Sequence, residues 1–390
     1  MKPLAFMVLL ALTASAPAQQ IPERDINAAA KALQSATTLD TNKYNPRAPL
    51  SPCELRPLQR PIFKMSVKLA DALTAAKTYS AAQQGLALII LQDGKVLHES
   101  YEAGANPKTL TASASMMKSL LALTIGIAVQ KKLIGSIDDP VGLYLSEWKD
   151  DPRGKITLRQ FLTMSSGLKL YSFADPSGDS LKLLLSTDIN AVALRHPLQD
   201  APGAVFRYNN ANSQIAGIVI DRQARKMGYR DFRDFIQREL WCPLGNGAGE
   251  LWLDREGGNP HYFAGLHASA EDWTRIGELI RNEGRVGKRQ VVPAQWIAEM
   301  LRPSVNNPNY GLQVWLGSPP DGKRRYSAEN PIAITHSEPY MANDVLFFDG
   351  FGGQRVYVVP SKGITIARTG FTNMAYDDAV IVNAVLKGLE

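Results

Sequence analysis

Apolar and polar positions along this chain follow patterns that predict two β-hairpins separated by a long helical region. The first hairpin is GLALIILQDGKVLHESY, whose apolar runs meet at Asp93-Gly94, a pair that favours tight two-residue turns. The second is RVYVVPSKGITIAR, with its turn at 360–363. Helical spacing of apolar residues predicts one helix at 62–79 and a closing helix at 376–389.

Most segments between the two hairpins have helical spacing. SAEDWTRIGELIRNEG begins with Ser269 in an N-cap position and ends at Gly284, and YRDFRDFIQREL is amphipathic. Strands near both ends with helices between them predict an α/β fold, in which an antiparallel sheet is flanked by helices. We expect this part to comprise 62–112 and 265–390, with an inserted all-α lobe at 113–264.

Two further segments do not belong to this pattern. Residues 19–61 are polar and dotted with prolines, which predicts an N-terminal extension lying over the surface. The segment 318–343 is rich in Pro, Gly and charged residues and is long for a loop. Such long loops are usually functional lids or mobile excursions, so we expect one of these here.

The first residues have the features of a secretory signal peptide. Lys2 supplies the positive charge, 4–12 the apolar core, and Ala16-Pro17-Ala18 a small-residue cleavage site. The apolar core is too short to span a bilayer, and no cysteine follows the cleavage site, which argues against a lipoprotein. We therefore expect a signal peptide at 1–18, cleaved after Ala18, and an exported protein that is periplasmic or secreted.

The charge and the cysteine count narrow the function classes. The formal net charge is +6, and no basic run is longer than 323–325, so we expect no nucleic-acid partner. No later segment is long and apolar enough to cross a membrane. Cys53 and Cys242 could form a disulfide in an oxidising compartment, or remain two free buried thiols. The histidines show no ligand spacing, so we expect neither a metal nor another cofactor.

Three Ser-x-x-Lys matches are candidates for a nucleophile with its base. They are Ser115 with Lys118, Ser146 with Lys149, and Ser166 with Lys169. Gly-Asp-Ser-Leu at 178–181 resembles the start of an esterase signature, but no histidine has an aspartate three residues before it. No Gly-x-Ser-x-Gly sequence is present either, which argues against an α/β-hydrolase triad.

Only Ser115 begins a long apolar helix, predicted from the almost wholly apolar run at 120–129. On such a helix Ser115 and Lys118 share one face, and the loss of hydration lowers the pKa of the lysine. A neutral amine could then accept the serine proton. The alternative is that Ser115 is an N-cap while Lys118 extends to water. The helix alone does not decide between them.

Two later motifs could complete a site with this pair. Tyr208-Asn209-Asn210 precedes another apolar helix at 214–221, and its phenol and carboxamide could move a proton and hold a substrate carbonyl. In FFDGFGG, Gly350, Phe351 and Gly352 come just before a strand, where backbone can approach a ligand closely. An exposed N–H there could complete an oxyanion hole with the N–H of Ser115.

The three motifs at 115–118, 208–210 and 350–352, in this order along the chain, resemble those of the serine β-lactamase and penicillin-binding protein superfamily. The resemblance runs from about residue 60 to the end and includes ITLRQFLTMSSGL, PGAVFRYNNANSQIAG and GLHASAEDWTRIGELI. It is greatest with class C β-lactamases, their esterase relatives and 6-aminohexanoate-dimer hydrolase. The resemblance implies an α/β sandwich with an inserted all-α lobe. It also implies that Ser115 is the nucleophile, Lys118 its base, Tyr208 a proton relay and Asn210 the carboxamide of the second motif.

The third motif departs from the superfamily pattern. Gly350-Phe351-Gly352 stands where true β-lactamases carry Lys-Thr-Gly or His-Thr-Gly, whose cation binds the β-lactam carboxylate. We therefore expect uncharged or linear amides and esters to be better substrates than penicillins. A cation from 323–325 on the predicted lid is the alternative source. The Glu-x-x-x-Asn deacylation element of class A enzymes is not recognisable.

Two other functions remain open from the sequence. One is a β-lactamase or D-Ala-D-Ala carboxypeptidase, and the other is a non-catalytic relative that binds peptidoglycan fragments or partners. The complete set of Ser115, Lys118 and Tyr208 favours an enzyme, because a binding protein does not need all three. We expect a small-molecule amide or ester as substrate, with peptidoglycan-derived compounds among the candidates. The oligomeric state stays open.

Overall fold

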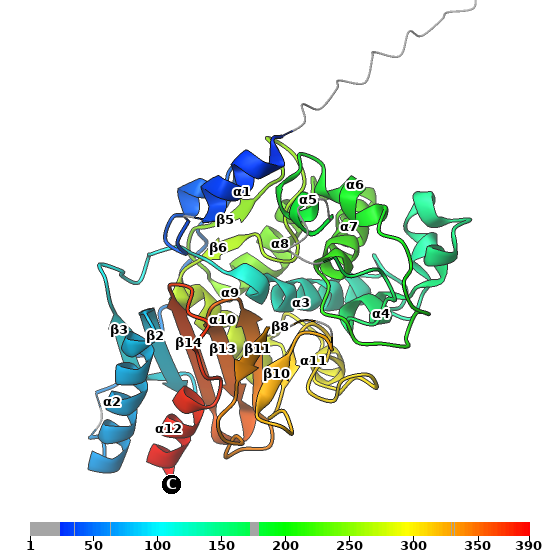
Figure 1. The fold of residues 1–390 in the computed structure, drawn as a ribbon. Helices are drawn as coiled ribbons and strands as arrows, with labels where there is room; N and C mark the ends of the chain where they lie inside the picture. The colour runs from blue at the N-terminus through cyan, green and yellow to red at the C-terminus, as the bar shows by residue number, and fades with distance from the viewer. Residues whose placement is uncertain (1–23, 35, 63, 172–178, 329, 331) are drawn as a thin grey trace, which may run out of the picture.

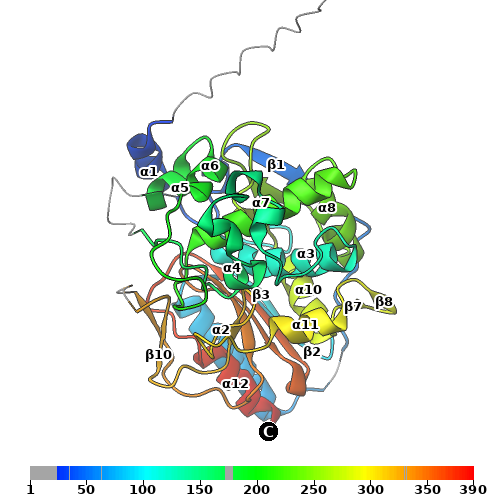
Figure 2. The same ribbon diagram turned by 90° about the vertical axis from the view of Figure 1, so that its right-hand side faces the viewer.

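The computed structural model describes residues 24–34, 36–62, 64–171, 179–328, 330 and 332–390. The predicted signal peptide lies outside this part of the chain and stays a prediction. Figures 1 and 2 show two regions, a sheet with its covering helices and a helical lobe at one end of that sheet.

The six-stranded sheet is antiparallel throughout and combines residues from both ends of the fold. Both predicted hairpins are confirmed: Asp93 and Gly94 turn the first with positive φ angles of 48° and 76°, and Gly363 turns the second at 66°. In spatial order the strands are β3 Lys95–Tyr101, β2 Gly85–Gln92, β14 Ile364–Gly370, β13 Gln354–Val359, β12 Leu346–Gly350 and β9 Trp315–Leu316.

Helices cover both faces of this sheet. The terminal helices α2 (Val67–Ala82) and α12 (Val380–Leu389) pack side by side on one face. Helix α10 (Ala270–Arg281) packs on the other face, and the Ser269 hydroxyl caps it by accepting a hydrogen bond from the Asp272 N–H. The predicted helices therefore exist, although α2 and α12 each begin a few residues later than the spacing indicated.

The lobe is mainly helical, although one strand, β5 (Gly249–Trp252), lies within the bounds of 113–264 that were expected to be all-α. Its central helix α3 is buried on all sides from Met117 to Ala128, because its sequence is apolar around the whole circumference. Helix α7 begins at Asn210 and extends beyond 214–221 at both ends. The helices of the lobe are α3 Met117–Gln130, α4 Leu158–Leu162, α5 Asp179–Leu185, α6 Ile189–Leu194, α7 Asn210–Lys226, α8 Phe232–Ile236 and α9 Cys242–Leu244, with a π-helical turn at Gln237–Trp241. Helix α11 (Ala294–Met300) comes later in the chain, after α10.

A second, four-stranded sheet joins the N-terminal extension to the lobe. The extension contains helix α1 (Ile26–Gln34) and strand β1, and β1 pairs antiparallel with β5. Leu50 at the end of β1 is buried, so the extension contributes to the core rather than only covering the surface. In spatial order the strands of this sheet are β1 Arg47–Leu50, β5 Gly249–Trp252, β6 Leu266–Ala268 and β4 Thr111–Ala112.

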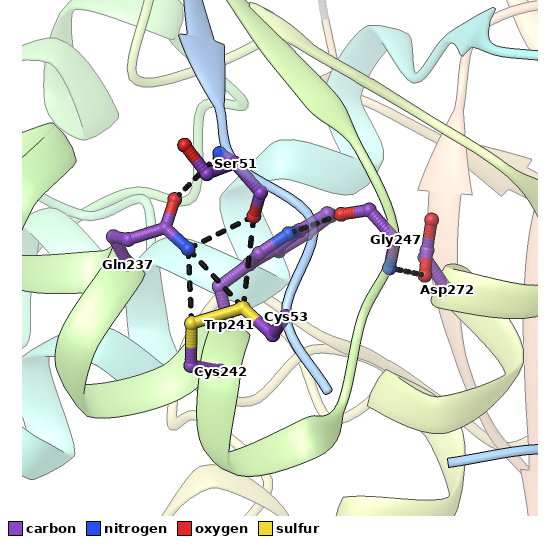
Figure 3. The surroundings of a disulfide bond; sticks show 7 residues. All are labelled: Ser51, Cys53, Gln237, Trp241, Cys242, Gly247 and Asp272. Atoms are coloured by element: carbon purple, nitrogen blue, oxygen red, sulfur yellow. Dashed lines mark hydrogen bonds between the residues drawn. A yellow bond between two sulfur atoms is a disulfide. The ribbon is translucent and has the colours of Figure 1, made fainter. Parts of the chain in front are cut away.

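A disulfide between Cys53 and Cys242 fixes the extension to the lobe, which decides against two free thiols. Figure 3 shows its surroundings. The Gln237 amide nitrogen lies 3.2 Å from the Cys53 sulfur and 3.0 Å from that of Cys242, and donates to the Ser51 carbonyl at 3.0 Å. The bridge joins residues 189 positions apart, so it closes a large part of the chain into one loop.

The segment 318–343 forms a small hairpin instead of an irregular loop. Its strands β10 (Lys323–Arg325) and β11 (Ala333–Thr335) pair antiparallel, and Tyr326 and Ile334 are buried in the core. A role as a lid stays a prediction. Among the described residues, no helix combines the length and the apolar character that a membrane span requires.

Candidate active site

Ser115 lies where the lobe meets the six-stranded sheet. Strand β4 leads into a 3₁₀ turn at Ala114–Met116, and α3 follows from Met117. Ala114 has a φ of +45°, a conformation that an L-residue adopts only at a cost. The N-cap of α3 is Met116, without a side-chain capping bond. The interpretation of Ser115 as an N-cap is therefore wrong.

Lys118 is only 1% exposed, so the alternative in which its amine extends to water is also wrong. Its Nζ lies 2.9 Å from Ser115 Oγ, 2.9 Å from Asn210 Oδ1 and 3.0 Å from the Phe263 carbonyl oxygen. The last two oxygens can only accept hydrogen bonds. A neutral amine that donates its two hydrogens to them points its lone pair at the Ser115 hydroxyl.

Burial lowers the pKa of Lys118 from 10.5 to about 7, because the protonated amine loses hydration inside the protein. The Asp349 carboxylate opposes this shift by attracting the protonated form. Burial has the opposite effect on Tyr208 and raises the pKa of its phenol well above 10, although a hydrogen bond with Ser115 lowers it in part. Near neutral pH the lysine can thus lose its proton, while the tyrosine keeps its own.

The ring of Tyr208 is fixed by an aromatic cluster. It stacks on Trp315, with centroids 5.9 Å apart and planes 28° apart, and contacts Tyr310 and Tyr326. The Tyr208 N–H donates to the Tyr326 carbonyl at 2.9 Å. Lys118 Nζ lies 4.8 Å from the Tyr208 ring centroid, so the two groups face each other across the site.

Asn210 is the first residue of α7, and the Asn209 side chain caps this helix by accepting from the Ala211 N–H. The helix start thus places the Asn210 amide oxygen on Lys118. The amide nitrogen on the other branch of the same side chain can still donate to a substrate carbonyl. The structure therefore brings Ser115, Lys118, Tyr208 and Asn210 into one cluster.

The third motif lies beside Ser115. A Cβ added at Gly350 would be 2.5 Å from the Ser113 carbonyl oxygen, so only glycine permits this approach. Gly352 has a φ of +75°, and a Cβ added to it would be 2.6 Å from Thr372, while Phe351 is 43% exposed. Neither the Ser115 N–H nor the Phe351 N–H donates to a protein acceptor in the part of the chain that the structure describes.

The other candidate serines lie in different surroundings. The Ser166 hydroxyl is buried and donates to Asn212 Oδ1 at 2.6 Å, which is a structural contact between two lobe segments. Ser146 and Lys149 lie at an exposed 3₁₀ turn. The Ser180 hydroxyl donates to the Tyr171 carbonyl, and the Gly178 that precedes it lies outside the described residues.

Of the three cations that the sequence offered at 323–325, Arg324 is buried in ion pairs, whereas Lys323 and Arg325 are exposed. Arg324 is 2% exposed, and its guanidinium contacts Asp378 at 2.7 Å and Asp349 at 3.0 Å. Arg355, from β13, binds the same two carboxylates. Sequence reasoning missed this cluster of Arg324, Asp349, Arg355 and Asp378, because only Asp349 and Arg355 are near each other in the chain and the tertiary fold brings the other two to them.

A serine paired with a buried lysine, between an antiparallel sheet and a helical lobe, is the arrangement of the β-lactamase and transpeptidase fold. The comparison with family models agrees: the Beta-lactamase model matches residues 70–384. This chain belongs to the Beta-lactamase family of serine hydrolases.

Solved structures with the same fold include hydrolases of several kinds. A Bacillus anthracis protein designated a candidate 6-aminohexanoate-dimer hydrolase superposes with a TM-score of 0.68 at 17% identity, over 90% of this chain and 91% of that one. EstCE1, a hydrolase with promiscuous acyltransferase activity, superposes with a TM-score of 0.62 at 15% identity, over 83% of this chain and 99% of that one. A family VIII carboxylesterase superposes with a TM-score of 0.60 at 13% identity, over 84% of this chain and 99% of that one.

Among curated proteins, Protein flp of Staphylococcus aureus (strain COL) is 26% identical over 153 residues. The match covers 36% of this chain and 30% of that protein. The chain thus spans less than a third of the length of this relative, and the activity of the whole relative does not follow from the match.

Proposed function

We propose that this protein is a serine hydrolase that cleaves an amide or ester bond through an acyl-enzyme on Ser115. The observation that carries the proposal is the contact of 2.9 Å between Ser115 Oγ and the buried Lys118 amine, whose pKa is lowered to about 7. A serine is a weak nucleophile until a nearby base takes its proton, and this amine meets that need.

The proposed reaction has two halves. Lys118 takes the proton of Ser115 as its oxygen attacks the substrate carbonyl, and the N–H groups of Ser115 and Phe351 stabilise the resulting oxyanion. The proton then passes from Lys118, through the Tyr208 hydroxyl, to the leaving amine or alcohol. Water releases the acyl group from Ser115 in the second half, by the same proton transfers in reverse.

Uncharged or linear amides and esters are the proposed substrates, in preference to penicillins. The third motif offers backbone N–H groups but no Lys or His side chain to bind a carboxylate beside the scissile bond. Arg324 is buried against Asp349 and Asp378, which further supports this preference. The likeness to a candidate 6-aminohexanoate-dimer hydrolase and to esterases is consistent with it.

We further propose that the protein acts outside the cytosol, in the periplasm or as a secreted protein. The signal-peptide pattern at 1–18 supports export. The Cys53–Cys242 disulfide is in keeping with it, since such bonds persist mainly in oxidising compartments.

Covalent labelling followed by kinetics tests the proposal. Intact-mass spectrometry after treatment with a fluorophosphonate should show one adduct on Ser115, absent from Ser115→Ala and retained in the control Ser166→Ala. Labelling only at Ser146, Ser166 or Ser180 would refute the assignment. A kcat/KM for nitrocefin tenfold above that for p-nitrophenyl butyrate would favour a β-lactamase instead. A lack of both labelling and turnover would favour a non-catalytic binding protein.

A further inference from the structure

The peptide group between Gly350 and Phe351 is held from behind by a buried guanidinium. Arg355 Nη1 donates to the Gly350 carbonyl oxygen at 2.7 Å, and Arg355 is 1% exposed. This peptide bond is trans, so the Gly350 C=O and the Phe351 N–H point in opposite directions on one rigid plane. Fixing the carbonyl therefore fixes the direction of the N–H.

Strand β12, which ends at this peptide group, lies against the turn that carries Ser115. Gly350 comes so close to this turn that a Cβ added to it would be 2.5 Å from the Ser113 carbonyl oxygen. The N–H groups of Ser115 and Phe351 both lack a protein acceptor among the described residues. Two such donors are what an oxyanion requires.

We propose that Arg355 is a positioning residue that presents the Phe351 N–H to the oxyanion formed at Ser115. The inference rests on the acyl-enzyme function proposed above. Besides fixing the direction of the peptide, the cation withdraws electron density from the Gly350 carbonyl. A peptide polarised in this way is a stronger N–H donor on its opposite side.

The guanidinium is suited to this task because it is itself held at several points. Its Nε donates to Asp378 Oδ1 at 2.9 Å, and Nη1 lies 2.7 Å from Asp349 Oδ1. The Tyr376 ring lies 5.2 Å from the guanidinium carbon. The fork geometry lets one cation bind carboxylates and a carbonyl at once, which a lysine cannot reproduce.

Arg324 provides a matched control within the same cluster. It binds Asp349 and Asp378, as Arg355 does, and is equally buried, but among the described residues it makes no contact with Gly350. Arg355→Lys and Arg324→Lys both keep the positive charge and both weaken the same ion pairs. Only Arg355→Lys releases the Gly350 carbonyl.

Steady-state kinetics on p-nitrophenyl butyrate should separate the two variants. We expect Arg355→Lys to lose about 10–10³-fold in kcat with KM changed little, up to the loss seen when one oxyanion donor is removed. Arg324→Lys should keep kcat within about threefold, although both variants should melt at lower temperatures than wild type. Equal losses of kcat in the two variants would overturn the inference.

A spectroscopic measurement reports on the donor directly. Hydrogen bonds to the acyl-enzyme carbonyl lower its infrared stretching frequency, so Arg355→Lys should raise that frequency and Arg324→Lys should leave it at the wild-type value. An unchanged frequency in Arg355→Lys would overturn the inference while leaving the proposed function intact. If wild type forms no adduct on Ser115, the proposed function fails and this inference fails with it.

A second pair of variants serves if Arg355→Lys does not fold. Arg355→Gln/Asp378→Asn and Arg324→Gln/Asp378→Asn each remove one charge of either sign, so the buried cluster stays neutral. The same contrast in kcat and in carbonyl frequency is expected between the two. Indistinguishable kinetics and spectra in this pair would contradict the role of Arg355.

Discussion

The Lys118 amine donates a hydrogen bond to the Phe263 carbonyl over 3.0 Å, deep in the junction between the lobe and the six-stranded sheet. Together with the contact to Asn210, this bond uses both hydrogens of a neutral amine. The remaining lone pair then faces Ser115 Oγ. The geometry and the lowered pKa thus support the same proposed role for Lys118, that of the base that takes the Ser115 proton. Each can be tested separately.

The first prediction concerns the pH dependence of the reaction. Since the proposed base is the neutral form of Lys118, kcat/KM for an uncharged ester should rise with pH through the lowered pKa of about 7. Stopped assays between pH 5 and 9 would measure this profile. A rate that is flat across this range, or that rises tenfold per pH unit up to pH 9 without levelling off, would show that no base with a pKa of about 7 takes part.

Removal of the amine is the second prediction. Lys118→Ala should lower kcat by about 10²–10⁴, the range for a positioned acid–base group, because nothing else in the cluster has a pKa near neutrality to replace it. Lys169→Ala, at an exposed position of another Ser-x-x-Lys match, is the control and should retain wild-type kcat. Near-normal turnover of Lys118→Ala would mean that the lysine is structural.

The contact between Ser115 and Lys118 and both hairpins could be predicted because their signals are local. Ser115 and Lys118 are three residues apart on a helix whose apolar sequence implies burial, and Asp93-Gly94 indicates its own turn. The Phe263 carbonyl could not be predicted as a partner of Lys118. Every residue carries a carbonyl, and only the tertiary fold selects this one.

The same reasoning explains why β1 and the contacts of Arg355 escaped prediction. The sequence RAPL at 47–50 is short and contains a proline, and it becomes a strand because β5, some 200 positions later, pairs with it. Arg355 and Asp349 directly oppose each other on β13 and β12, whereas Arg324 lies on β10 and Asp378 lies just before α12. A single sequence contains no signal for such long-range charge compensation.

The third prediction addresses Tyr208. Tyr208→Phe keeps the ring stacked on Trp315 but removes the hydroxyl, so the fold should persist while kcat falls by about 10²–10⁴. Tyr310→Phe removes a hydroxyl from the same aromatic cluster and should leave kcat near the wild-type value. Similar kinetics for the two variants would argue against Tyr208 as the proton relay.

The disulfide gives the fourth prediction. Cys53→Ser/Cys242→Ser should lower the free energy of unfolding by about 2–5 kcal/mol, since the bridge closes a long loop in the unfolded chain. The kcat of the folded double variant should stay near wild type, because none of the residues drawn around the bridge belongs to the candidate site (Figure 3). Urea denaturation and ester hydrolysis would check both parts, and an unchanged midpoint with an unchanged slope would contradict the first.

The last prediction concerns stability and follows from the sign of the pKa shift at Lys118. The pKa is about 7 in the folded state and 10.5 for an ordinary lysine, so between these values the unfolded chain binds a proton that the folded chain does not. The free energy of unfolding of wild type therefore gains about 1.4 kcal/mol per pH unit from this group as pH rises through the window. Lys118→Met lacks the contribution, so its stability relative to wild type should decline from pH 7 to pH 10.

Urea denaturation of both proteins at several pH values would measure this difference. Lys169→Met, which replaces an exposed lysine, controls for the general effect of the substitution. The absolute difference at one pH does not decide the matter, because methionine also leaves Asn210 Oδ1 and the Phe263 carbonyl without their donor. The change of this difference with pH does decide the matter. It arises only if the unfolded chain binds a proton at Lys118 that the folded protein does not bind. A difference between Lys118→Met and wild type that stays constant from pH 7 to pH 10 would mean that Lys118 remains protonated in the folded protein and cannot act as the base.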